Sequence, residues 1–151
     1  MQWFYDLIGN PFLITGVSSW AVAQILKLII HACIHKRIIW ERLFGDGGMP
    51  SGHSATVASL AVFTALNYGA GSFQFAVCAI LAVIVCHDAT GVRRQAGKHA
   101  VMINEIIAIL ESDELPEEKL KELVGHTPLQ VVMGVLLGAG NACLMYFLVF
   151  A

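Results

Sequence analysis

The chain has 151 residues, of which 57% are hydrophobic and 13% are charged. Soluble domains carry about 25% charged residues, so this composition excludes an ordinary soluble domain and also a disordered segment. The net charge of −2 excludes a strongly basic nucleic-acid binder, and we expect no nucleic acid among the partners. The class that remains is a compact membrane protein with a single domain over residues 1–151.

Four apolar runs are candidates for transmembrane helices, which need about 20 residues each to cross a bilayer core. The runs cover about residues 11–33, 54–68, 73–87 and 129–151. The second and third are short. They cross only if residues 49–53 and 89–92 continue the helices or if the membrane thins; otherwise they are half-buried helices of the bundle. The sequence therefore predicts an all-α, multi-pass membrane bundle with about four transmembrane helices.

The positions of lysine and arginine predict the orientation, because cytoplasmic connections collect these residues. Three of them lie between the first and second runs, and five lie between the third and fourth runs: Lys36, Arg37, Arg42, Arg93, Arg94, Lys98, Lys119 and Lys121. The N-terminus, the turn at residues 67–72 and the C-terminus contain none. We therefore expect both termini outside, both long connections in the cytoplasm, and a bacterial plasma membrane as the location.

The polar insertion at about residues 101–125 resembles a short cytoplasmic helical hairpin. Pro116 suits a first helical turn, Glu117 and Lys121 stand four residues apart, and Gly125 is a natural stop for a helix. The acidic residues between positions 111 and 118 are interpreted as a solvated face, with a partner site as the alternative.

The segment Gly-Gly-Met-Pro-Ser-Gly-His-Ser at residues 47–54 opens the second apolar run. Glycines expose backbone N–H groups, and a helix start adds unsatisfied donors and a positive dipole end, so this segment can hold a phosphate without a metal. Ser51 or Ser54 can also cap the helix, and a capped helix start without a ligand is the alternative. His53 favours the phosphate site, because a titratable ring is unusual at a membrane interface.

A second polar segment at residues 125–134 begins the fourth run. Thr127 and Pro128 have the residue types of a helix cap and a first helical residue. His126 then stands at a helix start, and Gln130, one turn further, can hydrogen-bond its ring. A lone histidine of this kind is usually only an interfacial residue, but two histidines at two helix starts on one membrane face favour a shared site.

The third polar segment, at residues 87–94, ends the third run. Arg93 and Arg94 carry planar guanidinium groups suited to phosphate oxygens, and Asp88 can pair with an arginine or orient a histidine. The alternative is that the arginines are positive anchors on the cytoplasmic side. Lys27, near the end of the first run, either extends to the interface or binds phosphate.

The motifs at residues 50–53 and 125–134 resemble the type 2 phosphatidic acid phosphatase superfamily, which includes the vanadium haloperoxidases. Residues 47–54 with Asp88-x2-Gly-Val-Arg-Arg are similar to its divergent branch of small membrane proteins. The likeness covers about residues 27–138. It implies that His53 is a general acid, that His126 attacks phosphorus, and that the phosphate is held by Ser51, Gly52 and Arg93.

The chain departs from the superfamily pattern at three places. The arginine that stands six residues before the nucleophile in the pattern corresponds to Arg93, which the polar insertion separates from His126. The aspartate expected four residues after the nucleophile is Gln130, a loss for which Asp88 is the candidate substitute. The first motif, Lys-x6-Arg-Pro, is imperfect, because Lys27 is followed by Arg37 and no proline.

The function predicted from these observations is hydrolysis of a lipid phosphate or diphosphate through a phosphohistidine. His126, His53 and Asp88 form the predicted catalytic set, and Gln130 supports the His126 ring. The predicted phosphate-binding residues are Lys27, Ser51, Gly52, Arg93 and Arg94. No metal or cofactor is expected, and phosphate or vanadate are the groups expected to occupy the site.

Two other readings come from different classes of protein. The first is a lipid-phosphate or anion carrier that kept the phosphate pocket without hydrolysis. The second is a structural membrane subunit in which Gly134-x3-Gly138 supports helix association. A homo-oligomer formed through such helix packing is a further prediction, with membrane lipids as the other expected partners.

Overall fold

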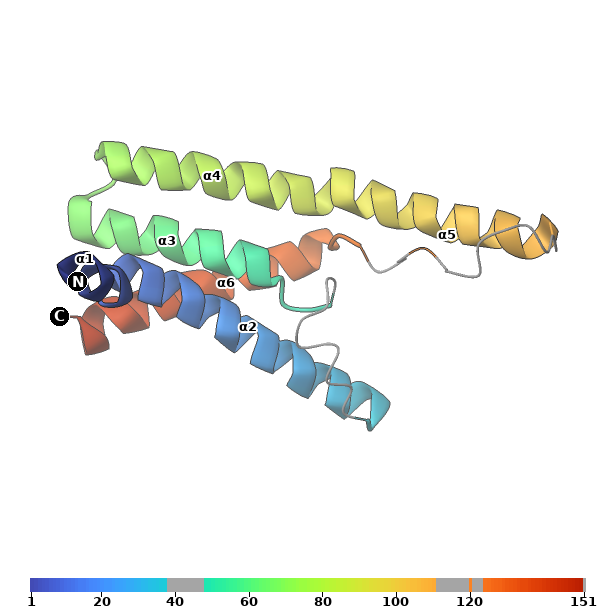
Figure 1. Ribbon diagram of the computed structural model, residues 1–151, viewed down its shortest axis with the longest axis horizontal. Coiled ribbons are helices and arrows are strands. Elements are labelled where there is room, and N and C mark those ends of the chain that lie inside the picture. The colour runs from blue at the N-terminus through green and yellow to red at the C-terminus, as the bar shows by residue number, and fades with distance from the viewer. Residues whose placement is uncertain (38–47, 111–119, 121–123, 151) are drawn as a thin grey trace.

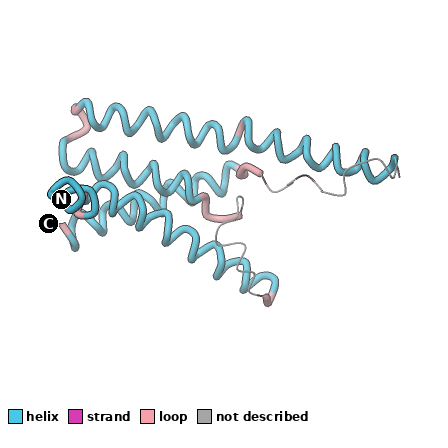
Figure 2. Tube along the Cα trace, viewed as in Figure 1, coloured by secondary structure: helices cyan, strands magenta, loops and turns pink. Residues whose placement is uncertain are grey.

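The computed structural model describes residues 1–37, 48–110, 120 and 124–150 (Figure 1). Its elements in chain order are α1 (Gln2–Ile8), α2 (Pro11–His35), α3 (Gly52–Tyr68), α4 (Phe73–Thr90), α5 (Val92–Leu110), α6 (Pro128–Leu144) and a short π-helix, η2 (Met145–Val149). All regular structure in these residues is helical (Figure 2), which confirms the all-α prediction.

Local sequence signals explain where the long helices begin. The side chain of Asn10 accepts hydrogen bonds from the backbone N–H groups of Phe12, at 2.9 Å, and Leu13, at 3.3 Å, and Pro11 takes the first position of α2. Ser72 caps α4 by accepting a bond from the Phe75 N–H. Each cap satisfies donors that a helix start would otherwise leave unpaired.

Helix α3 is the centre of the bundle. It lies between α2 and α4 in Figure 1, and it packs against α2, α4 and α6. Its buried residues are mostly small: Gly52, Ser54, Ala55, Val57, Ala58, Ser59, Ala61, Phe63 and Thr64. Small residues let helix backbones approach closely, which is how helices commonly pack inside membranes.

The closest approach is between α3 and α6. A Cβ atom added to Gly138 would lie 2.1 Å from the Ala55 carbonyl oxygen, and one added to Gly134 would lie 2.5 Å from the Ser51 carbonyl oxygen. Only glycine fits at these two positions. The Gly134-x3-Gly138 pair therefore packs within the chain, against α3.

Three helical segments are long and apolar enough to cross a membrane: Pro11–His35, Phe73–Ile109 and Pro128–Val149. Helix α3 has only 17 residues, which is below the length that a full crossing usually needs. A helical integral membrane protein is thus confirmed, whereas the predicted number of four transmembrane helices is not. The short α3 is also the helix with the most buried residues, because it packs against three other helices.

The first arm of the predicted hairpin is the last part of a longer helix. Helix α5 begins at Val92 and continues the line of α4 past Gly91, so α4 and α5 form one long rod in Figure 1. Most of the second predicted arm, including Pro116, Glu117 and Lys121, lies outside the described residues. Leu120 and Val124 are described and lie in no helix, and the side chain of Asn104 on α5 exchanges two hydrogen bonds of 2.9 Å with the Leu120 backbone.

The bundle has two distinct ends. Both termini and the turn between α3 and α4 lie at one end, whereas α3 and α6 begin at the other (Figure 1). Helix α4 ends on the same side as those two helix starts. All three polar segments singled out in the sequence therefore meet at one end of the molecule.

Candidate active site

His126 lies just before α6 and is only 5% exposed. Its backbone N–H donates a hydrogen bond of 2.9 Å to the carbonyl oxygen of Ala89, near the end of α4. The Nδ1 atom of its ring lies 3.3 Å from Oε1 of Gln130. Two contacts, one through the backbone and one through the ring, therefore fix the position of this side chain.

The start of α6 explains the ring contact. Thr127 and Gln130 form a capping box, in which the Thr127 hydroxyl accepts from the Gln130 N–H and Gln130 Oε1 accepts from the Thr127 N–H at 2.9 Å. The same Oε1 faces His126. Since this oxygen can only accept, Nδ1 of the neutral ring is the donor and Nε2 keeps the lone pair. The predicted cap at Thr127 and Pro128 and the predicted contact of Gln130 with the ring are confirmed.

His53, the second residue of α3, faces the same cavity as His126. The cavity has a volume of about 220 Å³, and Asp88 and Arg93 also line it. Its other walls are Ile84, Val85, Ala89, Val124 and Gly125. In contrast to His126, the His53 side chain is exposed. The structure thus brings together the two histidines that the sequence placed at two separate helix starts.

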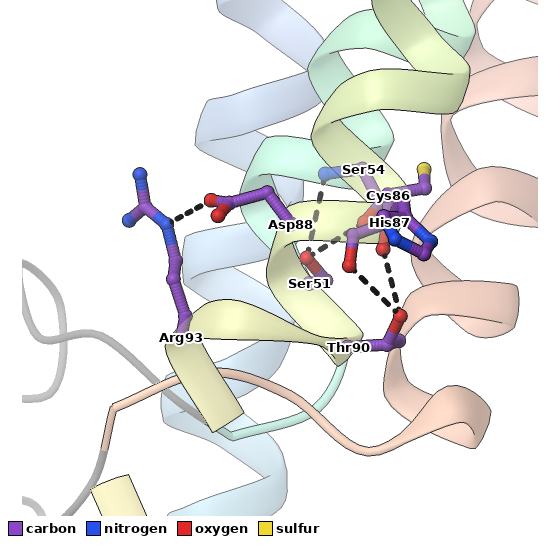
Figure 3. A network of polar contacts seen from close by, with 7 residues as sticks. All are labelled: Ser51, Ser54, Cys86, His87, Asp88, Thr90 and Arg93. Atoms are coloured by element: carbon purple, nitrogen blue, oxygen red, sulfur yellow. Dashed lines mark hydrogen bonds and ion pairs between the residues drawn. The ribbon is translucent and has the colours of Figure 1, made fainter. Parts of the chain in front are cut away.

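Asp88 forms an ion pair with Arg93, five residues further along the chain (Figure 3). The two side chains are 39% and 48% exposed, respectively, and no hydrogen bond joins Asp88 to His126. The sequence allowed Asp88 either to pair with an arginine or to orient a histidine, and in the structure it pairs with an arginine. Figure 3 shows the nearby Thr90 hydroxyl bonded to the carbonyl oxygens of Cys86 and His87 on its own helix, so these bonds of Thr90 are internal to α4.

Lys27 is buried inside the protein, with 5% exposure. The methylene groups of its side chain pass beside Gly48, and it is close enough to His126 to influence its titration. Burial lowers the pKa of His126 below the ordinary value, and the charges of Lys27 and His53 lower it further. Hydrogen bonds with Gln130 and with the Gly48 backbone act in the opposite direction.

A second cavity adjoins the first, and a third adjoins the second. The second, of about 260 Å³, is lined by Arg94, Lys98 and Gly48, and it also meets His126 and Gln130. The third, of about 330 Å³, reaches Lys27, His31 and His35 on α2. Arg93 and Arg94 thus line different cavities, and His126 lines both.

Ser51 and Gly52 occupy a different place from the one expected of phosphate ligands. Both are buried, and neither lines the cavities described above. The Ser51 N–H donates to the carbonyl oxygen of Gln130 at 3.1 Å, and its hydroxyl caps α3 by accepting from the N–H and the hydroxyl of Ser54. In the structure these residues join the starts of α3 and α6.

Three residues hold the site through their backbones, a role that the sequence did not assign to them. Ala89 anchors His126 only through its carbonyl oxygen, which any residue type could provide. Gly125 has a φ of +83°, and a Cβ atom there would lie 2.4 Å from the Arg94 backbone nitrogen, so it sets the close approach of this loop to α5. Gly48, with a φ of +84°, was visible only as part of the glycine-rich segment.

The imidazole rings and the cationic side chains around these cavities determine which chemistry the site can support. Two imidazoles face one cavity, one buried with Nδ1 engaged and one exposed, while Lys27, Arg93 and Arg94 provide positive charge around them. An anion of several oxygens, next to a nucleophile and a proton donor, fits this set. Among the residues described, no group of three or more His, Cys, Asp and Glu side chains is arranged to hold a metal ion.

Comparisons with known proteins agree with the motifs. Residues 8–140 match the family described as the divergent PAP2 family. YuiD of Bacillus subtilis (strain 168), described as an uncharacterized membrane protein, is 39% identical over 145 residues, which cover 88% of this chain and 92% of that protein. No solved structure matches the chain. The match over most of the chain, on top of the paired histidine motifs, means that this protein belongs to the divergent PAP2 family of membrane proteins.

Proposed function

We propose that this protein hydrolyses a phosphate monoester or diphosphate of a membrane lipid, through a phosphohistidine on His126. The observation that carries the proposal is the convergence of His126, His53 and a cationic group on one cavity at the shared end of α3, α4 and α6. The expected site is cytoplasmic, in a bacterial plasma membrane, because lysine and arginine gather in the connections at this end.

In the first step, Nε2 of His126 attacks phosphorus, and the bond from phosphorus to the leaving oxygen breaks. His53 gives its proton to that oxygen, so a monoester releases the lipid alcohol as a neutral group and a diphosphate releases the lipid monophosphate. A cation beside each developing oxygen charge lowers the barrier, which is the role we assign to Lys27, Arg93 and Arg94.

In the second step, His53 takes a proton from water, and the water oxygen attacks phosphorus. The bond from phosphorus to Nε2 breaks, inorganic phosphate leaves, and both histidines return to their starting states. The lowered pKa of His126 supports its role, because a neutral imidazole is the nucleophilic form.

A phosphate-release assay on the purified full-length protein tests the proposal. The substrates are a panel of lipid monophosphates and diphosphates, and the comparison is between wild type and His126→Asn. We expect release by the wild type and a loss of about 10³-fold or more in the variant. His99→Asn is the matched control, since His99 lies on α5 and lines none of the cavities described. Equal release by wild type and His126→Asn would contradict the proposal.

A second candidate function is non-hydrolytic binding or transport of a lipid phosphate or anion. The residue that favours it is Gln130, a neutral amide where the superfamily pattern has an aspartate. Without a carboxylate on Nδ1, the His126 ring is less stabilised as a cation during transfer. A carrier needs the phosphate pocket but not this charge.

Gln130→Glu distinguishes the two candidates, because glutamate at this helix position can keep the capping box and adds the carboxylate. If the protein is an enzyme, we expect the variant to retain turnover or increase it. If the wild type binds phosphate without release, the carrier is supported, and new release in Gln130→Glu would show that only the carboxylate was missing.

A further inference from the structure

An apolar groove leaves the cavity of the two histidines on the side of the bundle. It has a volume of about 350 Å³, and it shares His53 and Val85 with that cavity. Its remaining walls come from two helices: Gly16, Val17 and Trp20 of α2, and Thr56 and Val57 of α3. The exposed histidine therefore stands at the junction between a polar space and an apolar one.

The packing of the helices creates this groove. Helices α2 and α4 both pack against α3 but make little contact with each other, so α3 forms the floor between them. Val17 is 64% exposed and Trp20 is 38% exposed, which means that the groove opens outward. Since α2 and α4 belong to segments long and apolar enough to cross a membrane, we expect this opening to face lipid.

The groove offers almost no polar group to a ligand. Thr56 is its one hydroxyl-bearing residue, and that hydroxyl already donates to the Gly52 carbonyl oxygen at 2.9 Å. Gly16 lets α2 approach α3 beside the groove, because a Cβ atom there would lie 3.3 Å from the Leu60 side chain. A larger residue at position 16 would enter the space between α2 and α3. Hydrocarbon is the occupant that such a lining favours.

We propose that this groove holds the hydrocarbon chain of the lipid substrate, which enters sideways from the membrane, and that Val17 and Trp20 select the chain. This inference rests on the proposed function, since it places a phosphate headgroup in the adjoining cavity. The continuity of the two spaces at His53 supports it. An amphiphile with its phosphate beside His126 has its chain directed along α3, between α2 and α4.

The first test compares two substrates in two tryptophan variants. Val17→Trp narrows the groove, and Val83→Trp is the matched control, because Val83 is 69% exposed on α4 and does not line the groove. The substrates are a long-chain alkyl phosphate and p-nitrophenyl phosphate, which has no chain. We expect the ratio of kcat/KM values, alkyl over nitrophenyl, to fall about 10-fold in Val17→Trp and to stay constant in Val83→Trp. A constant ratio in both variants would overturn the proposal.

The second test does not need turnover. An alkyl phosphate with a diazirine at the end of its chain is photolysed with the full-length protein in detergent, and the labelled residues are located by mass spectrometry. We expect label on α2 around Val17 and Trp20, with strong reduction in Val17→Trp. The same chain ending in an alcohol, without phosphate, is the control for ordinary lipid contact. Equal labelling by the alcohol would overturn the proposal.

The two tests separate the groove from the proposed chemistry. Phosphate-dependent labelling at α2 without any phosphate release supports the groove and contradicts the phosphatase. Phosphate release with a constant substrate ratio and no label on α2 supports the phosphatase and contradicts the groove.

Discussion

The two histidines of the site stand at helix starts that are built differently. His126 precedes the first residue of α6, is buried, and is held by its backbone N–H and by Nδ1. His53 lies inside the first turn of α3 and is exposed, and its ring makes no hydrogen bond with any described residue. One ring is fixed in place and the other is accessible, although both face one cavity.

This difference corresponds to what the two proposed roles require. A nucleophile gains from a fixed position and a fixed tautomer, because misplacement by 1 Å can cost about 10²-fold in rate. A group that gives a proton to a leaving group and then takes one from water must reach both, so an accessible ring suits it. Four variants test whether this difference between the two rings is functional, taken in order of decreasing effect.

The contact that holds the two helix starts together is the first target. In Gly134→Val, the new side chain meets the Ser51 carbonyl oxygen, so we expect α3 and α6 to separate and the protein to lose several °C of thermal stability together with phosphate binding. Gly140→Val is the control, because nothing lies within 4 Å of a Cβ atom at Gly140. Unfolding followed by circular dichroism in detergent measures both. Equal stability of the two variants would mean that the close helix contact is not needed.

The second prediction separates the accessible ring from the fixed one. His53→Gln should lower kcat by about 10²-fold or more for an alkyl phosphate, whose leaving oxygen needs a proton, and much less for p-nitrophenyl phosphate, whose leaving group does not. Steady-state kinetics with both substrates measures the effect. His87→Gln on α4 is the control, since His87 does not line the cavity. An equal loss with both substrates would exclude His53 as the general acid.

The third prediction concerns the charge next to the fixed ring. Lys27→Met removes a positive charge that lowers the pKa of His126, so that pKa should rise, and the acidic limb of kcat/KM should move to higher pH. We also expect about 10-fold weaker phosphate binding, from loss of a charge-assisted contact. Proton NMR titration of the ring and isothermal calorimetry measure the two effects. In the control, Lys36→Met at the end of α2, neither value should change.

The fourth and smallest effect is expected at Asp88. Because its carboxylate pairs with Arg93, Asp88→Asn should free the guanidinium and strengthen vanadate or phosphate binding a few-fold, while turnover changes little. Both side chains are partly exposed, so the gain should shrink as salt is added. A fall in turnover with unchanged affinity would instead mean that Asp88 acts on His126.

The sequence predicted the parts of the site that depend on local signals. The cap of α6, its first proline and the contact of Gln130 with His126 all lie within five residues, so helix chemistry alone specifies them. The apolar runs also located the helices, because apolar length has a direct meaning in a membrane. The number of crossings was less certain, because α3 is short and its burial depends on three neighbours.

The parts that the sequence did not predict depend on contacts between distant segments. Helix α5 continues the line of α4 past Gly91. From the sequence, Asp88 could pair with an arginine or with a histidine, and only the geometry selects Arg93. Ser51 had the residue type of a phosphate ligand, but its N–H is bonded to the Gln130 carbonyl oxygen on α6.

The oxygen of the Gln130 side chain has a consequence for motion. It accepts from the Thr127 N–H and faces Nδ1 of His126 at the same time, so the first turn of α6 and the orientation of the ring depend on one atom. When that turn frays, the imidazole loses its partner in the same event. Hydrogen exchange at the Thr127 amide therefore reports the opening of this turn, and with it the loss of the ring's partner.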